Sequence, residues 1–249
     1  MRHLKVLVSC VPNFITLLNL FMGCLSIVFA FQGKLMVAAS LIFAAGMFDF
    51  FDGFAARALK AYSEMGKSLD SLADQVSFGL APSVILYQIM ILAVTRLNPA
   101  YTFENASLLE YTVTFSAFLI AAFSALRLAK FNIDERQTSS FIGVPTPANA
   151  FLIASFPFIL SNSGAGKEVL LNLYVLIPLI VFLSLLLTSE IPMLSLKIKT
   201  MKWEDNKALF VLLGVSVLLF IILKVIAVPF IFCTYLITSV VDNTLKKKA

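Results

Sequence analysis

The chain has 249 residues, of which 60% are apolar and 13% are charged, and its formal net charge is +5. A soluble domain of this length carries about a quarter charged residues, so the composition excludes an ordinary water-soluble globular protein. The positive charge suits anionic lipid headgroups and cytoplasmic anions. No nucleic-acid-binding motif accompanies it, so we expect no nucleic-acid partner.

Apolar segments follow one another along the whole chain. A helix that crosses a bilayer needs about 20 apolar residues, and segments 11–33, 75–95 and 169–189 meet this requirement without a charged residue. Region 208–241 contains one charge, Lys224, and is too long for one span, so we expect a turn between Lys224 and Pro229. We predict an all-α, polytopic transmembrane bundle with about eight spans, at 11–31, 35–59, 67–94, 109–131, 146–161, 168–189, 207–224 and 226–243.

The N-terminal segment and the cysteines have simple interpretations. The run from Val11 has no clear cleavage site, so we expect the first span to be retained. Cys10, Cys24 and Cys233 are odd in number and widely separated, which argues against a disulfide framework or a zinc site. We interpret them as small packing residues. No internal repeat or linker divides residues 1–249, so we predict a single transmembrane domain.

Basic residues predict the orientation of the bundle in the membrane. With the N-terminus in the cytoplasm, fifteen basic residues lie on the cytoplasmic side, against four on the other: Lys34, Arg96, Lys167 and Lys224. The positive-inside rule therefore places both termini in the cytoplasm.

Four aspartates occupy positions where a carboxylate is costly. Asp49 and Asp52 come late in the second span, and Asp70 and Asp74 come early in the third. An ionised Asp in the middle of a membrane helix costs about 2.5–3.5 kcal/mol on insertion scales. Spacings of three and four residues place each pair on one helix face, and the short turn near Tyr62 makes the helices antiparallel neighbours. We therefore expect the four carboxylates to converge near the cytoplasmic ends of both helices.

Four converging carboxylates repel one another unless cations lie between them. Oxygen ligands favour Mg²⁺ or Mn²⁺, with Ca²⁺ as an alternative, and four carboxylates can hold two such ions. Arg57 suits phosphate oxygens, while Gly53, Ala56 and Gly66 permit close approach of a ligand or helix. Headgroup-facing polar residues and a cation or proton pathway are the alternative interpretations. The first does not explain four acids in register, and the second lacks polar residues through the rest of the bundle.

Residues 52–74 spell D-G-F-A-A-R, eight residues, Gly66, three residues, Asp70, three residues and Asp74. This segment matches DGxxAR(x)8GxxxDxxxD at every specified position, and Asp49 extends the match to DxxDGxxAR. The chain thus resembles the CDP-alcohol phosphotransferase family, in which an alcohol displaces CMP from a CDP-linked donor.

The resemblance implies a six-helix core, here 11–189, followed by two additional helices in 190–249. It also implies a homodimer, with an active site that opens to the cytoplasm at the cell membrane. By the same resemblance, Asp49, Asp52, Asp70 and Asp74 bind the metal ions, and Asp74 also serves as general base. The residues implied to bind the CDP moiety are Asp49, Asp52, Gly53, Ala56, Arg57, Gly66 and Asp70.

Further segments resemble the membrane-integral phosphatidylserine synthases of this family, namely 11–19, 67–74, 76–82, 126–132 and 143–147. This resemblance implies CDP-diacylglycerol and L-serine as substrates. Because serine carries a carboxylate, its site should contain a cation, and Arg127 ends an apolar span at a suitable depth. The other candidates for the acceptor site are Asn132, Ser77 and Lys130; Asn13, Thr16 and Asn19 are candidates for nucleotide contacts.

Alternatives to these assignments stay open. Arg127 and Lys130 also fit the positive-inside rule alone, and Ser77 also fits a purely packing role. Glycerol 3-phosphate or an inositol phosphate is the alternative acceptor, and a metal-binding transporter is the alternative from another class. The sequence does not distinguish a diacyl donor from one with ether-linked isoprenoid chains.

Overall fold

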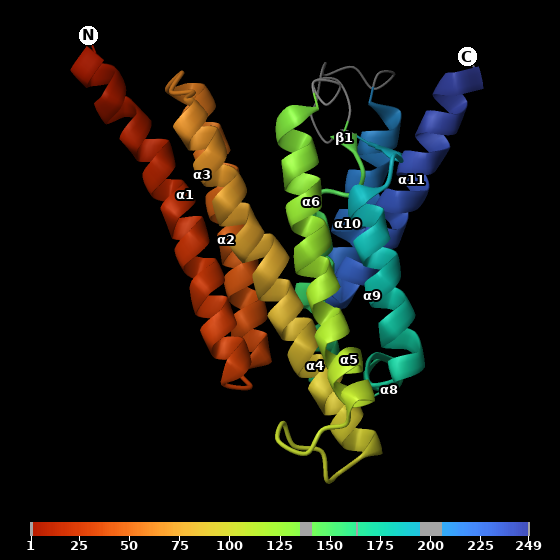
Figure 1. Cartoon of the computed structure of the whole chain (residues 1–249). Helices are drawn as coiled ribbons and strands as arrows, with labels where there is room; N and C mark the ends of the chain where they lie inside the picture. The colour runs from red at the N-terminus through yellow and green to blue at the C-terminus, as the bar shows by residue number, and fades with distance from the viewer. Residues whose placement is uncertain (1, 135–140, 163, 195–205, 249) are drawn as a thin grey trace.

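The computed structural model describes residues 2–134, 141–162, 164–194 and 206–248, which form a bundle of long helices (Figure 1). Its elements are α1 (Arg2–Phe31), α2 (Leu35–Ala58), α3 (Glu64–Asp74), a π-helix (Gln75–Leu80), α4 (Ala81–Leu97), α5 (Leu108–Phe115), a 3₁₀ turn (Ser116–Phe118), α6 (Leu119–Ile133), β1 (Phe141–Ile142), α7 (Thr146–Leu160), α8 (Ala165–Leu170), α9 (Leu173–Thr188), β2 (Pro192–Met193), α10 (Lys207–Leu223), a 3₁₀ turn (Lys224–Ala227) and α11 (Val228–Lys248). Both chain ends lie at one end of the bundle, here called the terminal end. The loop between α4 and α5 lies at the other, the distal end (Figure 1).

The predicted all-α, polytopic membrane fold is confirmed. In the described residues, five helical stretches are long and apolar enough to cross a membrane: Cys10–Phe31, Leu35–Ala58, Glu64–Leu97, Leu108–Ile133 and Lys207–Thr244. Two shorter apolar helices, α7 and α9, complete the bundle. Four basic residues used to predict the orientation, Arg136, Lys197, Lys199 and Lys202, lie outside the described residues.

The column formed by α3, the π-helix and α4 is the centre of the molecule. Its most apolar window is 72% buried, against 28% for α1 and for α2, whose outer faces expose apolar side chains such as Phe14 and Phe50. Ser63 caps the start of this column, because its hydroxyl accepts a hydrogen bond from the Gly66 amide at 3.0 Å. The acidic residues of α3 are therefore carried by the best-packed column of the fold.

Two predictions were wrong in detail. The span predicted at 168–189 is two helices, α8 and α9, because the Asn172 side chain accepts from the Tyr174 amide at 2.9 Å and starts a new helix there. The three cysteines are free, as predicted, but they are exposed on the outside of the bundle and are not packing residues. A small apolar thiol suits a lipid-facing surface as well as an interior.

Residues 207–248 divide at Lys224–Ala227, where the length of the apolar run predicted a turn. Lys224 has a φ of 53°, which ends α10 before α11 begins. Near the terminal end, the two-residue strands β1 and β2 pair in antiparallel register, Phe141 opposite Met193 and Ile142 opposite Pro192. This small ribbon joins the segment before α7 to the segment after α9.

Candidate active site

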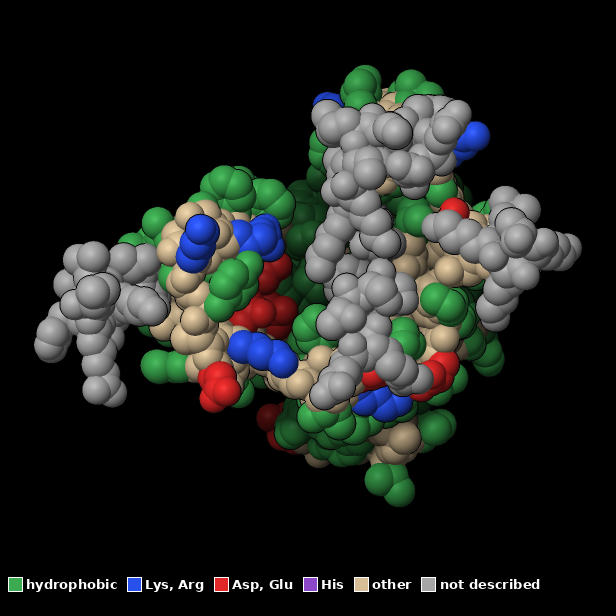
Figure 2. All heavy atoms as spheres, turned by 90° about the horizontal axis from the view of Figure 1, so that it is seen from above, with side chains coloured by type: hydrophobic (Ala, Val, Ile, Leu, Met, Phe, Trp, Pro, Cys, Tyr) green, Lys and Arg blue, Asp and Glu red, His purple; other side chains and the backbone are tan. Residues whose placement is uncertain are grey.

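Three of the four predicted carboxylates meet inside the bundle. Asp49 of α2 and Asp70 and Asp74 of α3 each offer an oxygen, and these oxygens lie within 4.8 Å of one another. Asp52 lies one turn beyond Asp49 on α2; its side chain is 6% exposed, and its Oδ2 atom has no hydrogen-bond partner among the described residues. Viewed from the terminal end, acidic side chains lie within a hollow that has basic side chains around it (Figure 2).

The donor set of this acid cluster (Asp49, Asp52, Asp70 and Asp74) fits a hard divalent cation. All of its ligand atoms are carboxylate oxygens, which Mg²⁺ and Mn²⁺ prefer. A buried carboxylate oxygen with no protein partner, such as Asp52 Oδ2, is costly unless a ligand satisfies it. The spacing of three and four residues explains the convergence, since each pair shares a helix face.

A cavity of about 610 Å³ opens beside the acid cluster, between α1, α2 and the start of α3. This volume lies in the usual range of ligand pockets, about 300–1,000 Å³. Its walls contain every signature position predicted to bind CDP except Asp49, and also Asn13 and Thr16 of α1. The lining residues are Pro12, Asn13, Thr16, Asp52, Gly53, Ala56, Arg57, Ala61, Tyr62, Ser63, Glu64, Gly66, Lys67 and Asp70. We call it the signature cavity.

Gly66 is a glycine because the signature cavity is tight at that position. A Cβ atom there would lie 3.0 Å from Ser63 Oγ and 3.2 Å from Asn13 Oδ1. At Gly53, by contrast, the nearest atom to such a Cβ is Arg57 Nη1 at 3.5 Å, which is ordinary contact. Gly53 therefore leaves room on the cavity side of α2, where a ligand can approach the backbone.

Asn19 contacts the acid cluster and not the signature cavity. Its Nδ2 donates to Asp74 Oδ1 at 3.3 Å, while its own Oδ1 has no partner among the described residues. The Ser77 hydroxyl donates to the Asn19 carbonyl at 2.9 Å, and Ser77 is fully buried where Gly23 of α1 crosses it. Ser77 thus lies in the helix contact that supports Asn19. It is not among the residues that line the signature cavity.

The π-helix that directly follows Asp74 was not predicted. It widens the helix over Gln75–Leu80, and Gln75 Nε2 donates to the Ala121 carbonyl of α6 at 3.0 Å. Short π-helical segments occur often at functional sites, because they re-aim the side chains next to them. Side-chain periodicity gave no signal for it, since a π-helix is a change in backbone hydrogen bonding and the residue types of Gln75–Leu80 do not mark it.

Arg127 lies on the other side of the acid cluster. Its side chain is 7% exposed, its Nη1 donates to Thr146 Oγ1 at 3.0 Å, and its Nε has no partner among the described residues. Its guanidinium also lies within electrostatic reach of the Asp74 carboxylate. Arg127 is therefore a buried cation beside the carboxylate that the family resemblance assigns as the base.

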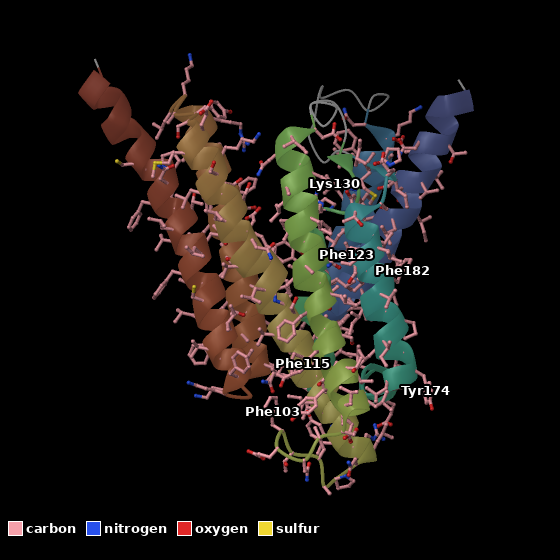
Figure 3. The ribbon with its side chains drawn as sticks, viewed as in Figure 1. Phe103, Phe115, Phe123, Lys130, Tyr174 and Phe182 are labelled. Atoms are coloured by element: carbon pink, nitrogen blue, oxygen red, sulfur yellow. The ribbon has the colours of Figure 1, made fainter. Side chains whose placement is uncertain are left out.

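A second cavity, of about 320 Å³, opens from Arg127 toward the terminal end, where Lys130 also lies (Figure 3). Its lining residues are Arg127, Lys130, Ile133, Asp134, Ile142, Leu187, Thr188, Ser189 and Glu190. We call it the arginine cavity. Asn132 is not among them: its Nδ2 donates to Ser71 Oγ at 2.9 Å, and its carbonyl accepts from Lys67 Nζ at 3.1 Å. Asn132 therefore links α6 to α3 at the rim of the signature cavity.

Three polar residues near Arg127 were not predicted. Thr146 holds the guanidinium, and Asn149 lies one turn along α7, 1% exposed, with neither amide atom partnered among the described residues. Ser124, one turn before Arg127 on α6, is fully buried with an unpartnered hydroxyl. The sequence marked segment 143–147 by its family resemblance, and its two prolines signal the start of a helix, but neither signal gave Thr146, Asn149 or Ser124 a role.

The family model of CDP-alcohol phosphatidyltransferase matches residues 9–195. The chain therefore belongs to the CDP-alcohol phosphatidyltransferase family. The chain is also similar to individual proteins of that kind. It is 35% identical over 170 residues to the CDP-diacylglycerol–serine O-phosphatidyltransferase of Bacillus subtilis, an alignment that covers 65% of this chain and 85% of the relative.

Two further relatives align over a shorter part of their length. The Helicobacter pylori (strain J99) protein of the same name is 36% identical, over 57% of this chain and 54% of the relative. The archaetidylserine synthase of Methanothermobacter thermautotrophicus is 33% identical, over 58% of this chain and 56% of the relative. The chain thus spans most of the Bacillus relative and a little over half of the other two.

Proposed function

We propose that the chain transfers the phosphatidyl group of CDP-diacylglycerol to the hydroxyl of L-serine, which gives phosphatidylserine and CMP. The observation that carries the proposal is the position of the acid cluster. On one side of it lies the signature cavity, and on the other lies the buried Arg127, which lines the arginine cavity. The names of the relatives support serine as the acceptor.

In this proposal, Asp49, Asp52, Asp70 and Asp74 hold two divalent cations, Mg²⁺ or Mn²⁺. Bound there, such ions neutralise the charge of the pyrophosphate. A bound cation would also satisfy Asp52 Oδ2, because a buried carboxylate oxygen without a partner requires a cation or a hydrogen-bond donor.

The signature cavity takes the CDP moiety. Arg57 supplies a planar donor fork for phosphate oxygens, and Gly53, Ala56 and Gly66 leave space beside it. Asn13 and Thr16 of α1 line the same cavity and are the candidates for contacts with the nucleotide. Lys67, also in the lining, adds a second cation at the mouth.

Asp74 takes the proton of the acceptor alcohol. The serine oxygen forms a bond to the β-phosphorus, the bond from that phosphorus to the CMP oxygen breaks, and CMP leaves with the electron pair. Asn19 holds one carboxylate oxygen of Asp74 by the 3.3 Å hydrogen bond, which keeps the other oxygen available for the proton. The contribution of the chain is thus to align the alcohol, the phosphorus and the base.

Arg127 binds the serine carboxylate, and Lys130 adds positive charge in the arginine cavity. A guanidinium pairs with a carboxylate through two parallel hydrogen bonds, and Arg127 keeps Nε free for this contact. Two basic side chains, Arg127 and Lys130, line this cavity, so a phosphorylated acceptor stays the alternative. That acceptor is glycerol 3-phosphate or an inositol phosphate, and the assay below separates both from serine.

We also propose that the terminal end faces the cytoplasm at the cell membrane and that the protein acts as a homodimer. The excess of basic residues predicted on that side supports this orientation, since CDP-linked donors and free serine are met there.

A direct assay tests the proposed function. Membranes containing the chain receive CDP-diacylglycerol and Mn²⁺ with serine, glycerol 3-phosphate or inositol phosphate, and CMP and lipid products are measured. We expect phosphatidylserine and CMP with serine alone. Lipid product from glycerol 3-phosphate but not serine would remove the serine assignment, and no CMP with any acceptor would remove the transferase assignment.

A further inference from the structure

Helices α10 and α11 lie beyond residue 195, where the family match ends, and yet α11 is hydrogen-bonded to the segment just before that point. Ser239 Oγ accepts from the Leu194 amide at 3.1 Å, and Asn243 Nδ2 donates to the Pro192 carbonyl. The Tyr235 hydroxyl donates to the Leu194 carbonyl at 3.4 Å. One face of α11 thus supports β2 and the residue after it, Leu194, through three side chains.

The support continues from β2 to the arginine cavity. Strand β2 pairs with β1, and the Gly143 amide donates to the Ile191 carbonyl at 2.9 Å. Gly143 has a φ of 75°, and a Cβ atom there would lie 2.7 Å from the Leu187 carbonyl oxygen, so the two segments fit only with glycine. Three residues beyond Gly143, Thr146 accepts the hydrogen bond of Arg127. The ribbon therefore positions both the cavity wall and the residue that holds the guanidinium.

Tyr235 also lies within electrostatic range of the arginine. Both side chains are buried, each 7% exposed, and the guanidinium and the phenol oxygen interact electrostatically. Arg127 is thus held from α7 by Thr146, and Tyr235 of α11 adds a polar group within electrostatic range of it. Burying a guanidinium is costly, so each polar neighbour that fixes its position affects what it can bind.

We propose that α11 is a structural part of the acceptor site, in which Ser239 and Tyr235 act as positioning residues for Arg127 and for the wall of the arginine cavity. This inference rests on the proposed function, because it takes the arginine cavity as the acceptor site. It assigns to α11 an effect on the affinity for the acceptor and none on the affinity for the CDP-linked donor. Within the described part of the chain, the signature cavity is lined by residues between 12 and 70, so α11 does not contribute to it.

The test uses the full chain with Ser239→Ala and Tyr235→Phe, separately. Each change removes one oxygen and keeps the packing. Ser155→Ala is the matched control, because Ser155 is also fully buried and, among the described residues, bonds only to the Leu152 carbonyl of its own helix. Tyr174→Phe is the second control, since Tyr174 is 90% exposed near the distal end (Figure 3). KM and kcat are measured for both substrates.

We expect KM for serine to rise about three- to tenfold in Ser239→Ala and in Tyr235→Phe, the effect of one buried hydrogen bond. KM for CDP-diacylglycerol should stay at the wild-type value, and both controls should behave as wild type. An unchanged serine KM in both variants would overturn the inference, as would an equal rise in both KM values. If Ser239→Ala does not fold, Tyr235→Phe decides, because its ring preserves the core.

The same data keep the two hypotheses apart. If the wild-type enzyme uses another acceptor, the serine assignment fails, and the KM for that acceptor then tests the role of α11. If no acceptor gives product, both the proposed function and this inference fall.

Discussion

The two ends of the bundle differ in the burial and the pairing of their polar side chains. Toward the terminal end, polar groups are buried without a protein partner: Asp52 Oδ2, Arg127 Nε and both amide atoms of Asn149, among the described residues. At the distal end, polar groups are exposed and paired with one another. The Arg96 guanidinium bonds to Glu168 at 2.6 Å, and the Asn98 amide donates to Glu110 at 2.9 Å.

The difference separates polar groups that serve the fold from those that serve a ligand. Glu110 also closes a capping box with Ser107, so the distal loop satisfies its own donors and acceptors. A buried polar atom left unpaired costs about 1–3 kcal/mol, and a fold retains that cost where a ligand removes it. The following predictions test whether the unpaired groups near the terminal end are reserved for ligands.

Removal of divalent cations should have the largest effect. With EDTA, we expect CMP release to fall to background. Without cations, the four carboxylates repel one another and also repel the pyrophosphate of the donor. Addition of Mn²⁺ or Mg²⁺ in excess should restore turnover. CMP release that persists at full rate after chelation would contradict a metal site at the acid cluster.

Asp74→Asn should lower kcat by about 10²–10⁴-fold, the usual range for loss of a general base. The amide keeps the size of the side chain and can still accept from Asn19 Nδ2. We therefore expect the variant to fold and to elute from size-exclusion chromatography as the wild type does. Glu104→Gln, in the exposed distal loop, is the matched control and should keep full activity. Near-normal turnover in D74N would remove Asp74 as the base.

Arg127→Met should raise KM for serine by about 10- to 100-fold, the effect of one charge-assisted pair, while KM for CDP-diacylglycerol stays unchanged. Methionine retains the apolar stem and its packing. Arg96→Met provides the control at the distal end, because Arg96 is paired and exposed. A rise in the donor KM alone would assign Arg127 to the nucleotide and not to the acceptor.

Asn149→Leu tests an unpaired group that no motif predicted. Leucine has a similar volume and no polar atoms, so we expect the melting temperature to rise while KM for serine rises about three- to tenfold. Opposite changes in stability and affinity are typical of a residue retained for its ligand. A fall in melting temperature with unchanged kinetics would identify Asn149 as a purely structural residue.

The sequence predicted the parts of the site that depend on local spacing. Intervals of three and four residues placed Asp49 with Asp52 and Asp70 with Asp74, and the short turn brought Asp49 together with Asp70 and Asp74. It did not predict the hydrogen bond between Arg127 of α6 and Thr146 of α7. No spacing in the sequence relates residues on two different helices. Such a contact depends on how α6 and α7 pack against each other, and a single amino-acid sequence does not predict that packing.

Two local features were also missed, for different reasons. The π-helix after Asp74 is a change in backbone hydrogen bonding, and the residue types of Gln75–Leu80 do not distinguish it from an α-helix. The break at Asn172 did have a signal, because Asn is a favoured helix cap. The apolar residues on both sides of Asn172 make one continuous run long enough to span a bilayer, and that pattern concealed the cap.

The smallest effect is expected at the distal salt bridge, and its size is itself informative. The hydrogen bond from Arg96 lowers the pKa of the Glu168 carboxyl, so the pair stabilises the fold above the unfolded pKa of glutamate and less as the pH falls through the folded value. Both side chains are about half exposed or more, at 48% and 62%, and water screens the pair. We therefore expect Glu168→Gln to leave kcat and both KM values unchanged and to shift the melting temperature only near the limit of detection. A clear loss of activity in E168Q would mean that the distal end takes part in the reaction, and the contrast between the two ends would then fail.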